Sequence, residues 1–233
     1  MTCASVHRHR VVPACRTLAV AGALVATTSF AHATNYDEVV SGDLSNNPAA
    51  PTNIGSLTPG SNRISGTTIP SGTFDPNSHF YSILDNDYVT FTVPTGYALS
   101  DITLGTDSII RPTDRLFLGI AQGSTVSVDP SFTSASGLLG WTLVDATMVG
   151  TDVLPDLGLS APANFPAIGG ATGFMGPLAS GQYTLWALDG DLPVAYDFKL
   201  DTVPAMPEPA SWAMMLAGIV VIGRTLRRRA RPQ

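Results

Sequence analysis

Residues 87–104 of the chain read DYVTFTVPTGYALSDITL and contain the clearest strand pattern in the sequence. The first seven residues alternate, with Val89, Phe91 and Val93 on one side of an extended chain and tyrosine or threonine on the other. A period of two indicates a β-strand whose two faces meet different environments. Residues 94–96 are a Pro-Thr-Gly turn signal, and residues 97–104 then return as a second strand. We therefore predict a hairpin of two paired strands.

A similar pattern extends over residues 34–204, where Gly, Pro, Ser, Thr and Asp separate short β-prone runs. Further runs of this kind occupy residues 62–69, 79–84, 115–121, 139–144, 182–188 and 194–200. Eight short strands separated mostly by turn signals predict an all-β fold, with a single β-sandwich or jelly-roll domain. Residues 145–177 are rich in Gly and Pro without a sustained period, so we expect a long surface loop there.

The N-terminal residues 1–33 have the three parts of a signal peptide. A region with several arginines precedes an apolar stretch over residues 17–30, and Ala31-His32-Ala33 is a small-x-small cleavage site. We expect a signal helix here and export through the Sec route. Cleavage would remove both cysteines and three of the four histidines, so the exported domain has no disulfide or thiol chemistry.

Charge is distributed unevenly along the chain. The formal net charge of the whole sequence is −6, but residues 34–204 hold seventeen acidic residues against four basic ones, a net charge of −13. So acidic a domain is unsuited to binding nucleic acid, which requires a positive surface. This balance fits an extracellular domain, including one that binds cations.

The C-terminal residues 205–233 combine three features in order. Pro207-Glu208-Pro209 comes first, an apolar stretch over about residues 210–226 follows, and an arginine-rich end completes the chain. This arrangement resembles the PEP-CTERM sorting domain. The resemblance implies insertion into the inner membrane as a transient intermediate, recognition by an exosortase-type enzyme, and delivery to the cell surface or the extracellular space. It also implies a Gram-negative bacterium that makes exopolysaccharide.

The apolar stretch of this tail is short for a membrane span. A helix over residues 210–226 is about 25 Å long, whereas the hydrocarbon core of a bilayer is about 30 Å thick. A short transmembrane helix suits a transient intermediate, with Trp212 at the outer interface and a cationic end in the cytoplasm. The cationic residues are Arg224, Arg227, Arg228 and Arg229. An ordinary single-pass tail anchor is the alternative.

Segments of the domain carry a second resemblance. They are Gly42-Asp43-Leu44-Ser45, Leu57-x-Pro59-Gly60-Ser61-Asn62 and Asp85-x-Asp87-Tyr88-x-Thr90-Phe91, with Gly181-Gln182-Tyr183-Thr184-Leu185-Trp186 near the end of the domain. These patterns resemble bacterial pre-peptidase C-terminal (PPC-like) β-sandwich modules. The resemblance implies a non-catalytic binding or structural role, although the long loop at 145–177 and the lack of an attached peptidase depart from the family.

The exported domain lacks the residues on which common hydrolases depend. A Ser-His-Asp or Cys-His site needs an imidazole base, yet only His79 remains, and neither cysteine nor a G-x-S-x-G motif occurs. Zinc sites need at least two His or Cys ligands. We therefore expect no catalytic residues and no enzyme. A secreted hydrolase that uses paired aspartates is the alternative, but the sixteen aspartates of the domain single out no pair.

Calcium is the one cofactor that the residue types support. Oxygen ligands cluster at Asp85 and Asp87, with Asp75 and Asn77 a few residues upstream. Ca²⁺ takes six to eight oxygen ligands from loops of this kind. Aspartate is also a common turn residue, so the domain is alternatively free of cofactors and these residues only shape turns.

Four aromatic residues, Trp141, Tyr183, Trp186 and Tyr196, lie in strand-like runs. Core packing is the expected role of such residues, and a sugar-stacking face is the alternative. Taken together, the sequence predicts a non-catalytic surface or biofilm-matrix protein, associated with exopolysaccharide. The alternatives are the aspartate hydrolase and a Ca²⁺-dependent module that binds carbohydrate or protein.

Overall fold

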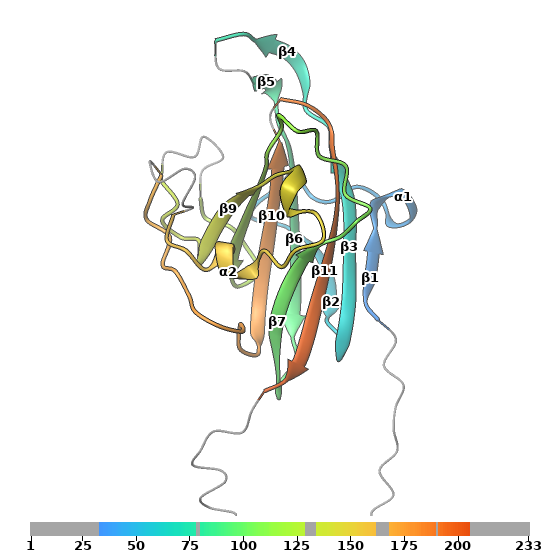
Figure 1. Ribbon diagram of the computed structural model, residues 1–233, viewed down its shortest axis with the longest axis vertical. Helices are drawn as coiled ribbons and strands as arrows, with labels where there is room; N and C mark the ends of the chain where they lie inside the picture. The colour runs from blue at the N-terminus through green and yellow to red at the C-terminus, as the bar shows by residue number, and fades with distance from the viewer. Residues whose placement is uncertain (1–32, 78–79, 129–133, 162–167, 190, 206–233) are drawn as a thin grey trace, which may run out of the picture. The chain divides into compact units, whose positions relative to one another are not determined.

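The computed structural model describes residues 33–77, 80–128, 134–161, 168–189 and 191–205, and these residues form an all-β fold (Figure 1). The first sheet contains, in spatial order, β1 (Asn35–Asp37), β3 (Gly60–Thr68), β11 (Val194–Pro204) and β7 (Tyr97–Leu104). The second sheet contains β2 (Thr52–Ser56), β6 (Asp85–Val93), β10 (Gly181–Asp189), β8 (Leu116–Gln122) and β9 (Gly140–Val144). Strands β4 (Ser71–Asp75) and β5 (Phe80–Ile83) form a separate hairpin. Each of the eight predicted strands is present, which confirms the all-β prediction. The expected signal helix and C-terminal transmembrane helix lie outside the described residues.

The predicted pairing within residues 87–104 is wrong. Strand β6 pairs with β10 over nine residues and with β2, whereas β7 pairs with β11 in the other sheet. The turn at residues 94–96 forms as expected, with the Tyr97 amide donating to the Pro94 carbonyl (3.1 Å) and Gly96 at a φ of 83°. The strands separate because both carry an apolar face, and a sandwich buries these faces against each other. The quoted stretch therefore joins the two sheets.

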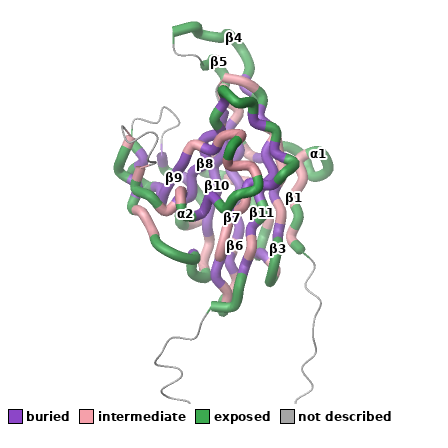
Figure 2. The backbone as a smooth tube through the Cα atoms, viewed as in Figure 1, coloured by how far each residue is buried: buried purple, intermediate pink, exposed green. Residues whose placement is uncertain are grey.

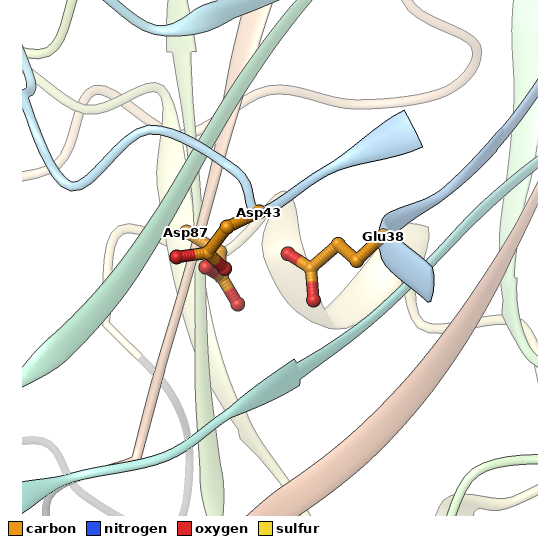
Figure 3. A group of neighbouring side chains, drawn as sticks. All are labelled: Glu38, Asp43 and Asp87. Atoms are coloured by element: carbon orange, nitrogen blue, oxygen red, sulfur yellow. The ribbon is translucent and has the colours of Figure 1, made fainter. Parts of the chain in front are cut away.

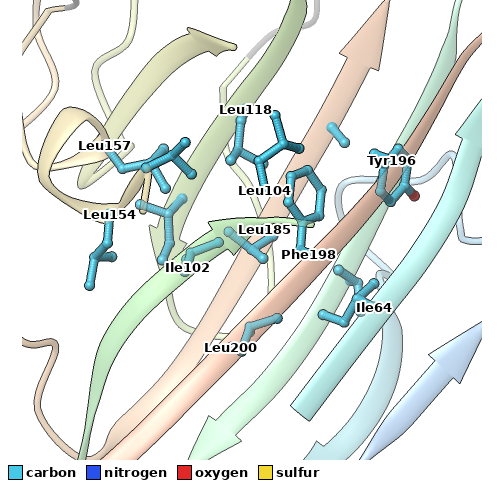
Figure 4. Packing of buried hydrophobic residues seen from close by; sticks show 14 of the residues in the cluster. Ile64, Ile102, Leu104, Leu118, Leu154, Leu157, Leu185, Tyr196, Phe198 and Leu200 are labelled. Carbon is cyan, nitrogen blue, oxygen red and sulfur yellow. The ribbon is translucent and has the colours of Figure 1, made fainter. Parts of the chain in front are cut away.

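The main core lies between the sheets (Figure 4). Ile64, Phe198 and Leu200 of the first sheet face Leu118 and Leu185 of the second. All five side chains are at most 1 % exposed. Burial of this kind stabilises the fold by about 25 cal/mol for each Å² of apolar surface removed from water.

Part of the expected surface loop at residues 145–177 contributes to this core. A 3₁₀ turn (Ala146–Met148) and the helix α2 (Leu154–Leu157) lie in it, and Val153, Leu154 and Leu157 are buried. Pro155 stands in the first turn of α2, where a proline needs no hydrogen-bond partner. The expectation of a surface loop is therefore wrong for this segment, because α2 and the residue before it place three apolar side chains against the edge strands β7 and β9.

A second apolar cluster covers the other face of the second sheet. Tyr88, Phe117, Trp141 and Trp186 form its centre, with the Phe117 and Trp186 rings 4.6 Å apart, and loop residues such as Leu138 cover them. Figure 2 shows the resulting band of buried residues along β6, β8 and β10. Tyr183 and Tyr196 are also at most 5 % exposed. The core interpretation of the four aromatic residues is thus confirmed, and they form no sugar-stacking face.

The strand directions give the sandwich two distinct ends. In the β3–β11 ladder Thr68 lies opposite Val194 and Gly60 opposite Thr202. The β4–β5 hairpin follows the end of β3, so it lies at the end where β11 begins; we call this the distal end. Strand β11 finishes at the other end, and Figure 1 shows the hairpin and the last residues of β11 on opposite sides.

Candidate metal centre

The N-terminal segment carries a glutamate to the distal end. Strand β1 runs parallel to β3, with Tyr36 opposite Ile64, and the one-turn helix α1 (Glu38–Ser41) follows directly. The Asp37 carboxylate caps this turn by accepting from the Val39 amide (2.9 Å). The Glu38 carboxylate accepts from the amides of Thr67 (Oε2, 2.7 Å) and Leu44 (Oε1, 3.1 Å). Its position is therefore held by two backbone donors.

Gly66 makes room for this carboxylate. A Cβ added at Gly66 would collide with the Tyr196 hydroxyl and with the Glu38 carboxylate, both of which occupy the space of a side chain. Gly66 and Tyr196 are paired in the β3–β11 ladder. The missing side chain thus lets Glu38 reach between the two sheets.

Asp87, on β6 in the other sheet, meets Glu38 there. Its side chain is 1 % exposed, and its Oδ2 accepts a hydrogen bond from the Tyr196 hydroxyl (2.8 Å). The other carboxylate oxygen, Oδ1, is buried without a hydrogen-bond partner. The Tyr196 hydroxyl also lies 3.5 Å from Glu38 Oε1, so it stands between the two carboxylates.

Asp43, in the loop after α1, completes what we call the acidic cluster: Glu38, Asp43 and Asp87. One carboxylate oxygen from each residue lies within 4.8 Å of those of the other two. Figure 3 shows the Glu38 side chain pointing from α1 toward the other two carboxylates. Asp43 is exposed, Glu38 is partly buried and Asp87 is buried, so the cluster leads from the surface to the interior.

Burial and mutual repulsion act on all three groups in the same direction. Burial, reinforced by the charge of Glu38, raises the pKa of Asp87 to about 8. Burial also raises the pKa of Glu38, against the two backbone hydrogen bonds, and the pKa of Asp43, where Asp85 adds to the effect. The pKa of Tyr196 lies well above its ordinary value, through burial and the proximity of Asp87, so its hydroxyl remains a donor.

The cluster opens onto a surface cavity of about 600 Å³. Glu38, Asp43 and Tyr196 line one part of it, and Arg63 with its two aspartates lines another. The Arg63 guanidinium contacts Asp197 (Nε to Oδ1, 2.6 Å) and Asp107 (Nη2 to Oδ2, 2.8 Å). Asp87 is not a lining residue and reaches the cavity only through its neighbours. The carboxylate oxygens of the acidic cluster are ligands of the kind that bind a hard cation.

The residues proposed from sequence as calcium ligands occupy two places. Asp75 and Asn77 lie in the β4–β5 hairpin, where the Asp75 Oδ1 accepts from the Asn77 amide (2.9 Å) in a local turn. Asp85 begins β6, and its carboxylate accepts from Ile69 N (2.7 Å) and Asn46 Nδ2 (3.1 Å). Only Asp87 joins the acidic cluster. His79 lies outside the described residues.

Sequence reasoning did not select Glu38 and Asp43 as ligands. One signal was visible, because Glu38 is the only glutamate between residues 34 and 204. Its distance of 49 positions from Asp87 gave no reason to join the two residues. Their contact depends on the parallel pairing of β1 with β3, which no local pattern specifies.

The comparison with protein families concerns the other end of the chain. A family model described as the PEP-CTERM protein-sorting motif matches residues 207–229. The chain therefore carries a PEP-CTERM sorting motif. The motif indicates export, sorting to the cell surface through the membrane, and processing by an exosortase-type enzyme. The predicted signal residues lie within the match and outside the described structure: Pro207, Glu208, Pro209, Trp212, Arg224, Arg227, Arg228 and Arg229.

No family model confirms the resemblance of the domain to PPC-like modules, which stays a prediction. No curated protein and no solved structure matches the chain significantly. Within the described ranges no helix has the length and apolar character needed to cross a bilayer, and the expected span at about residues 210–226 lies outside them.

Proposed function

We propose that this chain is a non-catalytic exported protein that acts at the cell surface or in the extracellular matrix, in association with exopolysaccharide. The observation that carries this proposal is the sorting motif at residues 207–229, which begins three residues after β11 ends at Pro204. The folded domain is thus followed at once by its sorting signal. The domain's net charge of −13 suits a hydrated extracellular setting.

The geometry of the acidic cluster supports a role without catalysis. In a hydrolase with two carboxyl groups, the protonated one must reach the leaving group of the substrate. Asp87 has the raised pKa of such an acid but is 1 % exposed and lies behind Glu38 and Tyr196. Glu38 is itself held by two backbone amides. A substrate in the cavity would meet Asp43, the exposed member of the acidic cluster, but no second free carboxyl group of that cluster.

Intact-mass analysis of the protein from its native host tests the sorting step. We expect the bulk of the material outside the inner membrane to end near Pro207–Pro209. Replacement of Pro207, Glu208 and Pro209 by alanine should leave the arginine-rich end in place and keep the protein in the membrane fraction. Met206→Ala is the matched control and should be processed normally. Wild-type protein that retains Arg227–Arg229 in bulk would instead indicate a permanent tail anchor.

Association with exopolysaccharide is a separate part of the proposal. Mature protein should co-sediment with the purified polysaccharide of the producing cells, and dextran of similar size should retain less of it. Equal or absent retention on both polymers would contradict this part while leaving the sorting step intact.

A further inference from the structure

The acidic cluster has no basic partner in the part of the chain that the structure describes. The ion pairs there join Arg63 to Asp107 and Asp197, and Arg111 to Asp114. Three carboxylates whose oxygens lie within 4.8 Å of one another repel when they are charged. Their backbone and tyrosine donors offset only part of this repulsion.

A second observation, independent of the clustering, is the unsatisfied oxygen of Asp87. Nearly all buried polar atoms in folded proteins have a partner, and an unpaired buried one costs free energy. Asp87 is 99 % buried, and its Oδ1 has no hydrogen-bond partner, although Oδ2 accepts from Tyr196. The Asp87 carboxylate lies beside those of Glu38 and Asp43, with one of its oxygens within 4.8 Å of theirs. A cation bound between the three carboxylates would give the open oxygen a partner.

We propose that Glu38, Asp43 and Asp87 bind one Ca²⁺ ion between the two sheets. All three donors are carboxylate oxygens, which select hard cations rather than zinc or copper. Calcium–oxygen distances of about 2.3–2.6 Å place ligands up to about 5 Å apart across the ion, so one Ca²⁺ ion can contact carboxylate oxygens that lie within 4.8 Å of one another. Magnesium demands near-octahedral geometry and keeps several of its waters, so a site of protein carboxylates suits calcium better. Water would complete the coordination from the open cavity.

The ion would add a direct link between the α1 turn and the second sheet. Glu38 is the first residue of α1, which directly follows the three-residue strand β1, and Asp43 lies just after α1, while Asp87 lies in the second sheet. The side chains of Val39 and Val40 on α1 are 94 % and 82 % exposed, so little apolar contact holds this turn. Ion binding should therefore restrain the N-terminal segment, residues 33–45, against the sandwich. This inference does not depend on the sorting step.

Calcium titration of the purified full chain tests the proposal. After treatment with a chelator, calorimetry should detect one site with a dissociation constant of about 10⁻⁴–10⁻³ M, the range of extracellular calcium modules. In 10 mM CaCl₂ the melting temperature should rise by about 3–10 °C. MgCl₂ at the same concentration should give less than half of this rise. Hydrogen exchange should slow in peptides over residues 33–45 and stay unchanged in the hairpin, residues 71–77.

Two matched variants separate the acidic cluster from the aspartates of the hairpin. Asp87→Asn keeps the shape and the acceptor for Tyr196 but replaces the open oxygen by an amide that can donate to Glu38 or Asp43. This variant should melt above the wild type without calcium and lose the calcium-induced rise. Asp75→Asn, the control, should keep the full rise.

Several results would overturn the inference. They are flat calorimetry with no change in melting temperature at 10 mM Ca²⁺, an equal response to Mg²⁺, or a calcium response that survives in Asp87→Asn. Loss of the response in Asp75→Asn alone would move the site to the hairpin. A folded Asp87→Asn variant, verified by its melting transition, keeps the comparison valid.

Discussion

Two buried aspartates at the distal end of this sandwich each place a carboxyl group away from water, and they have different partners. Asp197 on β11 is 2 % exposed and is paired with the Arg63 side chain at 2.6 Å. Asp87 on β6 is 1 % exposed and has a tyrosine hydroxyl, an open oxygen and two carboxylates around it. One charge is thus neutralised by the chain itself. The other must take up a proton or a cation from solution, which makes its state depend on conditions.

The largest expected effect comes from breaking the ion pair between Arg63 and Asp197. Arg63→Ala leaves the buried Asp197 without its cation. Loss of one partner of a fully buried pair costs about 3–5 kcal/mol of unfolding free energy, and because the Arg63 side chain is 41 % exposed we expect about 2–3 kcal/mol here. Urea denaturation measures this loss. Lys199→Ala removes a neighbouring exposed cation without a described ion pair and should change stability by less than about 0.5 kcal/mol. Equal effects of the two substitutions would show that the pairing of Asp197 contributes nothing specific.

The pH dependence of stability isolates Asp87. Its pKa of about 8 in the folded protein exceeds the ordinary value of 3.8, so the folded state keeps a proton that the unfolded state releases. This contribution is complete below pH 4 and is lost as the pH rises through about 8. Without calcium, unfolding free energy should therefore fall by about 1.4 kcal/mol per pH unit between pH 5 and 7. Denaturation at pH 5, 6 and 7 measures the slope.

Other carboxyl groups with raised pKa values, among them Glu38 and Asp189, act in the same direction and steepen this slope. Asp87→Asn should reduce the slope by about 1.4 kcal/mol per pH unit, the contribution of one proton. A slope that is the same in Asp87→Asn and in the wild type would place the retained proton elsewhere.

A smaller effect comes from the space above Gly66, which the Tyr196 hydroxyl and the Glu38 carboxylate occupy. Gly66→Ala should cost about 1–3 kcal/mol, because the added methyl group collides with the Tyr196 hydroxyl and the Glu38 carboxylate. Gly169→Ala is the control, since no atom lies within 4 Å of its added Cβ. Thermal unfolding of both variants measures the difference. A neutral Gly66→Ala variant would mean that Glu38 can leave the interior freely.

The smallest expected effect concerns the exposed member of the acidic cluster. Asp43→Asn should change the calcium-free unfolding free energy by less than about 0.5 kcal/mol, because Asp43 is exposed and forms no ion pair with the described part of the chain. Calcium affinity, measured by calorimetry, should fall at least tenfold. Unchanged affinity would reduce the site to Glu38 and Asp87.

The long strands could be predicted from the sequence, whereas the short strands and one strand pairing could not. Strand β7 has the predicted bounds, and β6 and β10 differ from theirs by one or two residues. The short strands β1, β2 and β4 were not predicted, since three to five residues carry too little periodicity. The pairing of β6 with β7 was predicted wrongly, because a turn signal specifies a change of direction but not the sheet that the next strand enters.

For the candidate site, the sequence identified Asp87 as a candidate oxygen ligand and missed its partners. Aspartate in a turn and aspartate in a charged site look alike in a single sequence. What distinguishes Asp87 is the absence of a side chain at Gly66 and the arrival of Glu38 from β1, both of which act across the β3–β11 ladder.

The period-two strands, the acidic character of the domain and the sorting motif at residues 207–229 can be read from the sequence, because each depends on composition or on residues that are close in the chain. The entry of β6 and β7 into different sheets and the meeting of Glu38, Asp43 and Asp87 become visible only in the folded chain. Those outcomes depend on which apolar faces bury each other, a balance summed over the whole core. In the resulting arrangement Asp197 is paired with Arg63, whereas one carboxylate oxygen of Asp87 is left for a proton or an ion.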